Sequence, residues 1–309
     1  MRWVNSLGPA AAALALAACG NYSTEDVRFL AALPTRGDLH VRVPASGASG
    51  ALAACTSGEA TVWIGAKPVS DGLNGGVDLI VGLVDAVRRV EPSQRADDLR
   101  VWGPFDDDRH PGREIRVVIT RETGPDEAVA HRFAFEARVK GQADFTKVLT
   151  GEFEGPSASV GKGSLELNFE ALWSLGMNDA GTPHGALLAT YDRTGEPRRV
   201  GIAIVGGALG LGSFGYDFEG WADGSGSFSY RIPRGLDRLY ISSSFDATGA
   251  GRAAVSYVTW LGLGGSFEQC WDASACLVYV NDPQDYSCST PPCSLGEVGS
   301  CPAVPSPPF

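Results

Sequence analysis

Apolar and polar residues alternate along much of the chain, which predicts β-strands that are apolar on one face and polar on the other. Turn residues such as Gly, Pro and Asp separate the alternating runs, so neighbouring strands are expected to pair antiparallel. We expect roughly ten to twelve strands, more than an open twisted sheet usually holds without curling. Strands are predicted at 39–43, 61–64, 115–119, 133–139, 165–169, 200–204, 214–218, 228–232, 239–245 and 255–257.

One segment has the period of a helix instead. After Gly76, valine and isoleucine recur at helical spacing until Pro92, which predicts a principal helix over about 76–90. A shorter capped helix is predicted between Ser23 and Pro34. A helix with one apolar stripe needs a sheet to lie on. The fold class predicted is mainly β (α+β): a large curved antiparallel sheet, either a half-barrel or a water-soluble barrel, with one principal helix packed on it.

Composition supports this fold and excludes several classes of protein. The 309 residues include 40 Gly and 19 Pro, which favour turns over long helices, and the 44% of hydrophobic residues excludes a disordered chain. With 36 acidic and 25 basic residues the formal net charge is −11, so the surface repels phosphate backbones. We therefore expect no nucleic-acid partner.

The N-terminus has the features of an export signal. A positive start at Arg2 is followed by an apolar run over 7–18 and by the sequence Leu16-Ala17-Ala18-Cys19. This segment resembles a bacterial lipoprotein signal peptide with its lipobox. The resemblance implies cleavage before Cys19, acylation of that cysteine, and a mature protein held on the cell envelope by its lipid, at the periplasmic face or the cell surface. Because Gly20 and Asn21 follow, with no Asp, it further implies the outer membrane.

Two alternatives to the lipobox compete. A membrane-spanning helix needs about 20 apolar residues, and the run here is shorter and is interrupted at Gly8-Pro9. An ordinary secretory signal with a chance cysteine is the other alternative. The membrane is thus expected as a partner through a lipid anchor.

The cysteines agree with an exported protein. Lipidation takes one of seven cysteines and leaves six, an even number that suits a disulfide framework, with 15 possible connectivities. No CxxC pair and no neighbouring His is present, so a zinc site is not expected. The disulfide candidates are Cys55, Cys270, Cys276, Cys288, Cys293 and Cys301.

Five of these six cysteines lie in a Pro-containing stretch near the C-terminus. Such a segment contains too few apolar residues to form a core of its own, so disulfide cross-links are its expected source of stability. The predicted organisation is a signal peptide over 1–18, a single β-rich domain over 19–268, and a disulfide-rich extension over 269–309.

Motifs that carry catalysis are weak. The GxGxxG pattern at 210–215 precedes an alternating run instead of the helix that a dinucleotide site needs. The acidic run 106–108 suits a solvated turn better than a calcium site. Carboxylates two residues apart, such as Glu152 with Glu154 and Asp217 with Glu219, fit a solvated sheet face better than a glycosidase pair. We therefore predict no enzyme activity, no cofactor and no bound metal.

One face of the predicted strands is rich in aromatic side chains. The function that we expect depends on whether this face is filled by a helix or left open. If a helix fills this face, the protein is an envelope component with a structural or protein-interaction role, which is our first hypothesis. If the face is concave and empty, it forms a binding module or carrier for a lipid or other apolar ligand. The candidate residues for that ligand are Phe133, Phe135, Phe214, Tyr216, Phe218, Phe228 and Tyr230.

Overall fold

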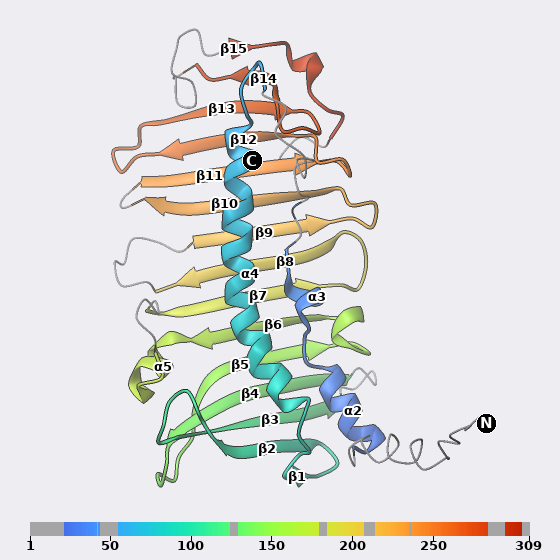
Figure 1. Cartoon of the computed structure of the whole chain (residues 1–309), viewed down its shortest axis with the longest axis vertical. Helices are drawn as coiled ribbons and strands as arrows, with labels where there is room; N and C mark the ends of the chain where they lie inside the picture. Colours follow the sequence, from blue (N-terminus) through green and yellow to red (C-terminus); the bar gives the residue numbers. More distant parts are fainter. Residues whose placement is uncertain are drawn as a thin grey trace, which may run out of the picture.

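The computed structural model contains one antiparallel sheet of 15 strands in which the spatial order of the strands is their order in the sequence (Figure 1). The structure describes residues 22–41, 43, 55–123, 129–178, 184–206, 214–234, 237–283 and 294–304. The strands are β1 (Gln94–Arg95), β2 (Leu99–Asp106), β3 (Arg113–Thr123), β4 (Val129–Val139), β5 (Thr146–Glu154), β6 (Lys162–Asn168), β7 (Ala186–Asp192), β8 (Arg198–Val205), β9 (Phe214–Gly220), β10 (Gly226–Arg234), β11 (Asp237–Phe245), β12 (Gly251–Val258), β13 (Gly264–Trp271), β14 (Leu277–Asn281) and β15 (Ser294–Leu295). The helices are α2 (Thr24–Ala31), α3 (Arg36–Leu39), α4 (Thr61–Val87) and α5 (Phe169–Leu175), with 3-10 turns η1 (Ala158–Val160) and η2 (Val298–Ser300).

The mainly β prediction is confirmed, and each alternating run from residue 115 onward lies in a strand, except that Phe169 begins α5. Asn168 ends β6 and caps that helix, because its side chain accepts a hydrogen bond from the backbone N–H of Ala171. The sheet does not close into a barrel: β1 and β15 are its two edges and lie at opposite ends of the molecule (Figure 1).

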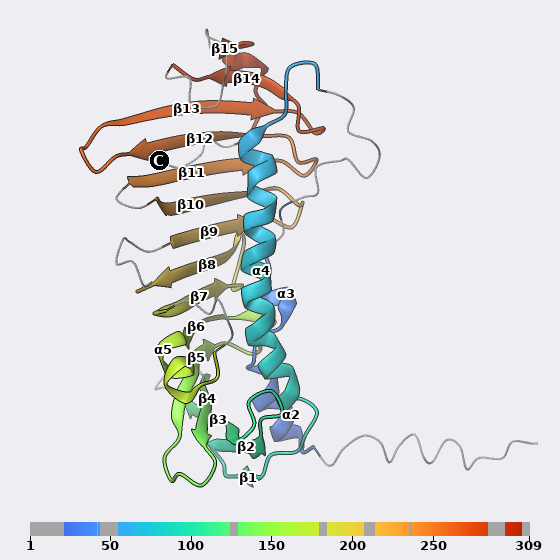
Figure 2. The ribbon, with the colours of Figure 1, turned by 60° about the vertical axis from the view of Figure 1, so that its left-hand side comes forward.

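Helix α4 runs across the strands and covers one face of the sheet (Figures 1 and 2). Most of its buried residues follow one another at spacings of three and four, which places them on a single stripe. At its start the Thr61 hydroxyl accepts a hydrogen bond from Gln269 of β13, and just beyond its end the carbonyl of Val90 accepts one from Trp102 of β2. The stripe consists of Trp63, Ala66, Ser70, Leu73, Val77 and Ile80.

The principal helix is therefore longer than the predicted segment 76–90, and the strand predicted at 61–64 is wrong. Pro68 and several glycines interrupt the apolar period in the first half of α4, and Pro also removes one backbone hydrogen bond. Packing of the buried stripe against the sheet overrides these weak local preferences.

The short helix predicted after Ser23 is confirmed as α2, where Ser23 and Asp26 form a capping box. Over the residues that the structure describes, which leave out Arg42, the strand predicted at 39–43 is wrong, because Leu39 ends α3 and Val41 pairs with no described strand. The side-chain amide of Asn74 takes the place of a strand partner: its oxygen accepts from the N–H of Val41 at 2.9 Å and its nitrogen donates to the carbonyl of Val41 at 3.0 Å.

On the face under α4, aromatic rings lie over glycines of neighbouring strands. A Cβ atom at Gly151 would lie 2.3 Å from the Phe133 ring, and one at Gly251 would lie 2.8 Å from the Trp271 ring. Each glycine is opposite its ring in the strand register. These glycines are needed for close approach, since no larger residue leaves room for the ring.

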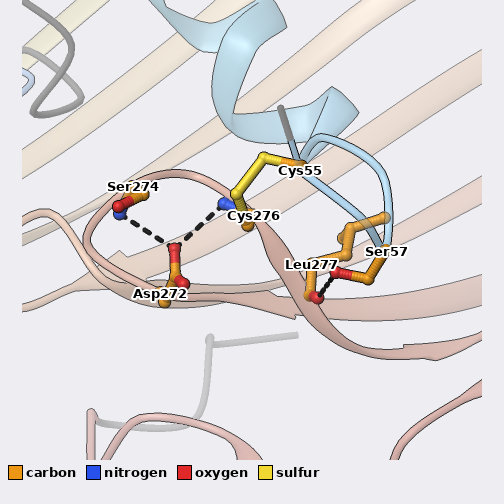
Figure 3. Close-up of a disulfide and its surroundings, with 6 residues drawn as sticks. All are labelled: Cys55, Ser57, Asp272, Ser274, Cys276 and Leu277. Carbon is orange, nitrogen blue, oxygen red and sulfur yellow. Dashed lines mark hydrogen bonds between the residues drawn. A yellow bond between two sulfur atoms is a disulfide. The ribbon is translucent and has the colours of Figure 1, made fainter. Parts of the chain in front are cut away.

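Two disulfides join parts of the chain that are distant in sequence. Cys55, which precedes α4, is bonded to Cys276 of the β13–β14 turn, 221 residues away (Figure 3). Cys270 of β13 is bonded to Cys301. The disulfide framework is thus confirmed for four cysteines, while Cys19, Cys288 and Cys293 lie outside the described residues. Since β13 spans residue 269, the sheet continues into the segment predicted as a separate extension.

Candidate functional site

The aromatic residues singled out from the sequence belong to the core. Phe133, Phe135, Tyr216, Phe218, Phe228 and Tyr230 are buried, and Phe214 is partly buried against the same cluster. Trp63 of α4 fills the space between them and the later strands: its ring lies 5.2 Å from that of Phe245 and 5.3 Å from that of Trp271, centroid to centroid. Most of the aromatic face is therefore filled by α4 and does not form a broad cavity.

An apolar pocket nevertheless lies beside the first half of α4. It has a volume of about 480 Å³ and is bounded by the helix on one side and by strands β10 to β13 on the floor. Of the aromatic candidates, only Tyr230 lines it. The lining residues are Thr61, Val62, Gly65, Ala66, Val69, Tyr230, Ile232, Leu239, Ile241, Val255 and Phe267.

Glycine at position 65 keeps the helix side of the pocket open. A Cβ atom placed there would have no heavy atom within 4 Å. Val62 and Val69, which lie one turn before and one turn after Gly65, also line the pocket. The strand floor is made by inward-facing residues, because side chains two apart on a strand share a face: Leu239 with Ile241 on β11, and Tyr230 with Ile232 on β10.

The polar atoms of the lining are occupied within the protein. The hydroxyl of Tyr230 donates to the carbonyl of Ala66 at 3.2 Å and lies 3.3 Å from the hydroxyl of Ser70. Burial raises the pKa of Tyr230 to about 12, so this hydroxyl stays neutral at physiological pH. The lining contains no charged side chain. The pocket is therefore suited to an apolar group held by dispersion and the hydrophobic effect, without a directed polar contact.

The start of α4 is fixed beside the floor of the pocket by covalent and polar bonds at the turn between β13 and β14. The Cys55–Cys276 disulfide lies just before the helix (Figure 3). In the same turn the Asp272 carboxylate accepts hydrogen bonds from the backbone N–H groups of Ser274 and Cys276, and the Ser57 hydroxyl donates to the carbonyl of Leu277. These bonds hold the helix wall in place and preserve the space between helix and strands.

Two carboxylates of the acidic run 106–108 are paired with different basic side chains. The Asp106 carboxylate accepts from the Lys140 ammonium at 2.6 Å, whereas the Asp107 carboxylate lies 2.7 Å from Nδ1 of His110. The carboxylates thus engage separate partners. Within the described parts of the chain, no group of three or more His, Cys, Asp or Glu is arranged to hold a metal ion.

The paired carboxylates lie on exposed strand surface. Glu152 and Glu154 border a second hollow of about 370 Å³, where Glu154 forms an ion pair with Lys162 at 3.0 Å. Glu219 is paired with Arg199 at 2.8 Å. Glu154 and Glu219 thus form exposed ion pairs of a solvated face. Of the GxGxxG segment, 210–213 lie outside the described residues, and β9 begins at Phe214 where a dinucleotide site requires a helix.

Comparison with protein-family models, with curated protein sequences and with solved structures finds no match. Among the described helices, α4 included, none combines the length and apolarity required to cross a membrane.

The pocket itself was not predicted from the sequence. Strands containing Leu239, Ile241 and Val255 were predicted, but a strand was predicted at 61–64 and the helix only from about residue 76, so the second wall was missing. The alternating three- and four-residue spacing from Trp63 to Leu73 was the signal that identifies this wall.

Proposed function

We propose that the protein is an exported, lipid-anchored envelope protein that binds one acyl chain, or an apolar group of comparable size, in the pocket beside α4. The observation that carries this proposal is the uncharged cavity of about 480 Å³. Its volume falls within the range of small-molecule sites, about 300–1,000 Å³. Of the two functions considered from the sequence, the pocket favours the binding module over a purely structural role.

The remaining elements of the proposal come from the sequence and the covalent structure. Leu16-Ala17-Ala18-Cys19 supports lipid attachment, and the two disulfides are typical of an oxidising compartment. An acyl-chain binder on a membrane surface has its ligand source at hand. Each methylene group moved from water into the pocket contributes about 0.8 kcal/mol.

The proposal is tested by filling the pocket from its helix wall. We expect saturable binding of cis-parinaric acid, a fluorescent fatty acid, at one molecule per chain. Gly65→Leu places a side chain in the pocket and should weaken this binding at least about tenfold, since a branched four-carbon group takes the volume of several ligand methylenes.

Gly72→Leu is the matched control. Gly72 lies two helical turns after Gly65, its Cβ position also has no heavy atom within 4 Å, and it does not line the pocket. Binding by this variant should equal that of the unaltered chain. Equal affinity in both leucine variants, or fluorescence that never saturates, would exclude the pocket as the site.

A further inference from the structure

The turn between β12 and β13 exposes several large apolar side chains. Trp260 is 67% exposed, Leu261 62%, Leu263 67% and Val258 43%. In Figure 2 this hairpin projects beyond the neighbouring strand connections at the left of the sheet. Three such side chains on one turn and a fourth at the strand end beside it are not the scattered exposure that is normal on a protein surface.

The backbone of the turn is largely satisfied by internal hydrogen bonds. The N–H of Thr259 donates to the carbonyl of Leu263 at 2.7 Å, and that of Gly262 donates to the carbonyl of Thr259 at 2.9 Å. The Thr259 hydroxyl donates to the carbonyl of Leu263 and accepts from the backbone N–H of Leu263, and the backbone N–H of Trp260 donates to the carboxylate of Asp237. Because the polar groups of the turn are hydrogen-bonded to one another, transfer of the turn from water into a membrane costs less free energy.

The turn has no charged residue of its own, and the charged side chains of Asp237 and Arg238 at the start of β11 lie at its base. No Asp, Glu, Lys or Arg occurs over 258–266. Arg238, which is exposed, stands opposite Val258 in the register of β11 and β12. If the tip of the turn entered the headgroup region of a bilayer, the guanidinium of Arg238 at the base of the turn would lie at the level of the lipid phosphates. Tryptophan is the side chain most typical of that region, because its ring is apolar and its N–H needs a polar neighbour.

We propose that the β12–β13 hairpin inserts its tip into the interface of a lipid bilayer, with Trp260, Leu261 and Leu263 as the inserted side chains. A short convex turn is a poor basis for a specific protein interface, which requires about 800 Å² from each partner and a complementary shape. A bilayer needs no complementary shape, and it accepts apolar side chains in proportion to their area.

The hairpin extends the strands that form the floor of the pocket. Val255 of β12 and Phe267 of β13 line the pocket, and both strands continue into the turn. An inserted tip therefore holds the pocket near the membrane surface, which is the source of acyl chains. The insertion itself does not rest on the proposed ligand, since it depends only on the hairpin.

The test uses the mature chain, residues 19–309, with Cys19→Ser, so that neither an attached lipid nor the apolar run over 7–18 contributes, and phosphatidylcholine vesicles containing about one fifth phosphatidylglycerol. The triple variant Trp260→Ser, Leu261→Ser, Leu263→Ser should partition into vesicles at least about tenfold less than its parent. The control carries Val27→Ser, Val160→Ser and Val298→Ser, which removes three comparably exposed apolar side chains elsewhere. It should partition like the parent.

A second measurement reports on the tip without altering its apolar character. The Trp260 fluorescence is taken as the difference between the Cys19→Ser chain and the same chain with Trp260→Phe. With brominated phosphatidylcholine vesicles this difference signal should shift to the blue and be quenched. An unquenched signal, or equal partitioning of the two triple variants, would overturn the proposal. Unchanged vesicle binding by Gly65→Leu separates this result from the test of the pocket.

Discussion

At the scale of single residues, the carboxylate of Asp26 is fully buried and accepts several hydrogen bonds. Its oxygens accept from Nε of Arg100 at 2.6 Å and from Nε of Arg95 at 3.1 Å, and also from the backbone N–H of Ser23. Burial by itself would raise the pKa of Asp26, but these hydrogen bonds outweigh burial and hold the pKa at about 2. The carboxylate thereby fastens α2 to the segment around β1 and β2.

Asp26→Asn should lower the free energy of unfolding by about 3 kcal/mol at pH 7, because Arg100 is left buried without a charged partner. A carboxyl with a lowered native pKa contributes stability above its unfolded pKa and loses it as pH falls through the native value. The unaltered chain should thus lose about 2 kcal/mol between about pH 4 and pH 2 that the variant does not lose. Urea unfolding across this range measures both effects.

Asp71→Asn is the control for that series, because Asp71 forms an exposed pair with Lys67. Its variant should unfold within about 0.5 kcal/mol of the unaltered chain. A difference between Asp26→Asn and the unaltered chain that does not change with pH would contradict the assignment.

His131 presents the opposite situation. It is buried between the rings of Phe29 and Phe153, at centroid distances of 5.6 and 6.2 Å. Neither ring nitrogen has a hydrogen-bond partner among the described residues. Burial, together with the charge of Arg121, lowers the pKa of His131, so the ring is neutral in the folded protein.

His131→Phe should stabilise the fold by about 1 kcal/mol at pH 8, since two unpaired polar atoms leave the core. A histidine with a lowered native pKa stabilises fully above its unfolded pKa of about 6.5, and this contribution is lost at lower pH. The advantage of the variant should therefore grow from pH 8 to pH 5, as measured by thermal unfolding. A constant advantage would argue against a neutral buried ring.

At the scale of elements, glycine has two different roles. In the sheet, Gly151 makes room for the Phe133 ring. In α4, Gly75 is exposed and a Cβ there would meet no atom within 4 Å, so it only weakens the helix.

Ala substitutions should separate these roles. Gly75→Ala should raise the free energy of unfolding by up to about 1 kcal/mol through helix propensity. Gly151→Ala should lower it by about 2 kcal/mol, because the added methyl group displaces the Phe133 ring. Chemical denaturation of the two variants beside the unaltered chain tests the pair, and changes of the same sign would refute the distinction.

An element can be predicted from the sequence when residues close together in the chain determine it, and is missed when distant packing determines it. Alternation over a few residues was sufficient to predict β4 and β10, because their burial pattern is set by side-chain direction alone. The first half of α4 was missed because its helix depends on packing against strands that lie far along the chain, while Pro68 and Gly72 oppose it locally. The pocket depends on that same packing, and it was missed for the same reason.

At the scale of the whole molecule, the described N-terminal segment and the exposed hairpin lie far apart. Helix α2 is bonded to the end of the sheet near β1 to β3, through Asp26 and through the pair of Glu25 with Arg121. The turn after β12 is about ten strand spacings away, or roughly 48 Å at about 4.8 Å per spacing. Figure 1 also places α2 at the right-hand ends of the strands and the β12–β13 hairpin at the left-hand ends, so the two lie at opposite corners of the sheet.

Cys19→Ser should release the protein from washed membranes while leaving it folded. Repeated washing removes reversible surface contacts such as that of the hairpin, whereas an acylated protein with several chains stays attached. Quantification of the protein in the wash and in the membrane pellet, with disulfide content as the check on folding, measures the outcome. Retention of the serine variant after washing would refute the lipid anchor.

The order of the strands has a consequence for how the chain folds. Each strand pairs with the one made just before it, so the sheet can grow hairpin by hairpin from β1. Helix α4 is made before all of these strands, yet Trp63 packs against Trp271, and Thr61 is bonded to Gln269 across 208 residues. Contacts of such long sequence separation form late and slowly. The start of α4 therefore cannot pack on the sheet until the last strands have folded. The Cys55–Cys276 disulfide then forms at the end of folding, because the two thiols come together only when the last strands of the sheet are in place.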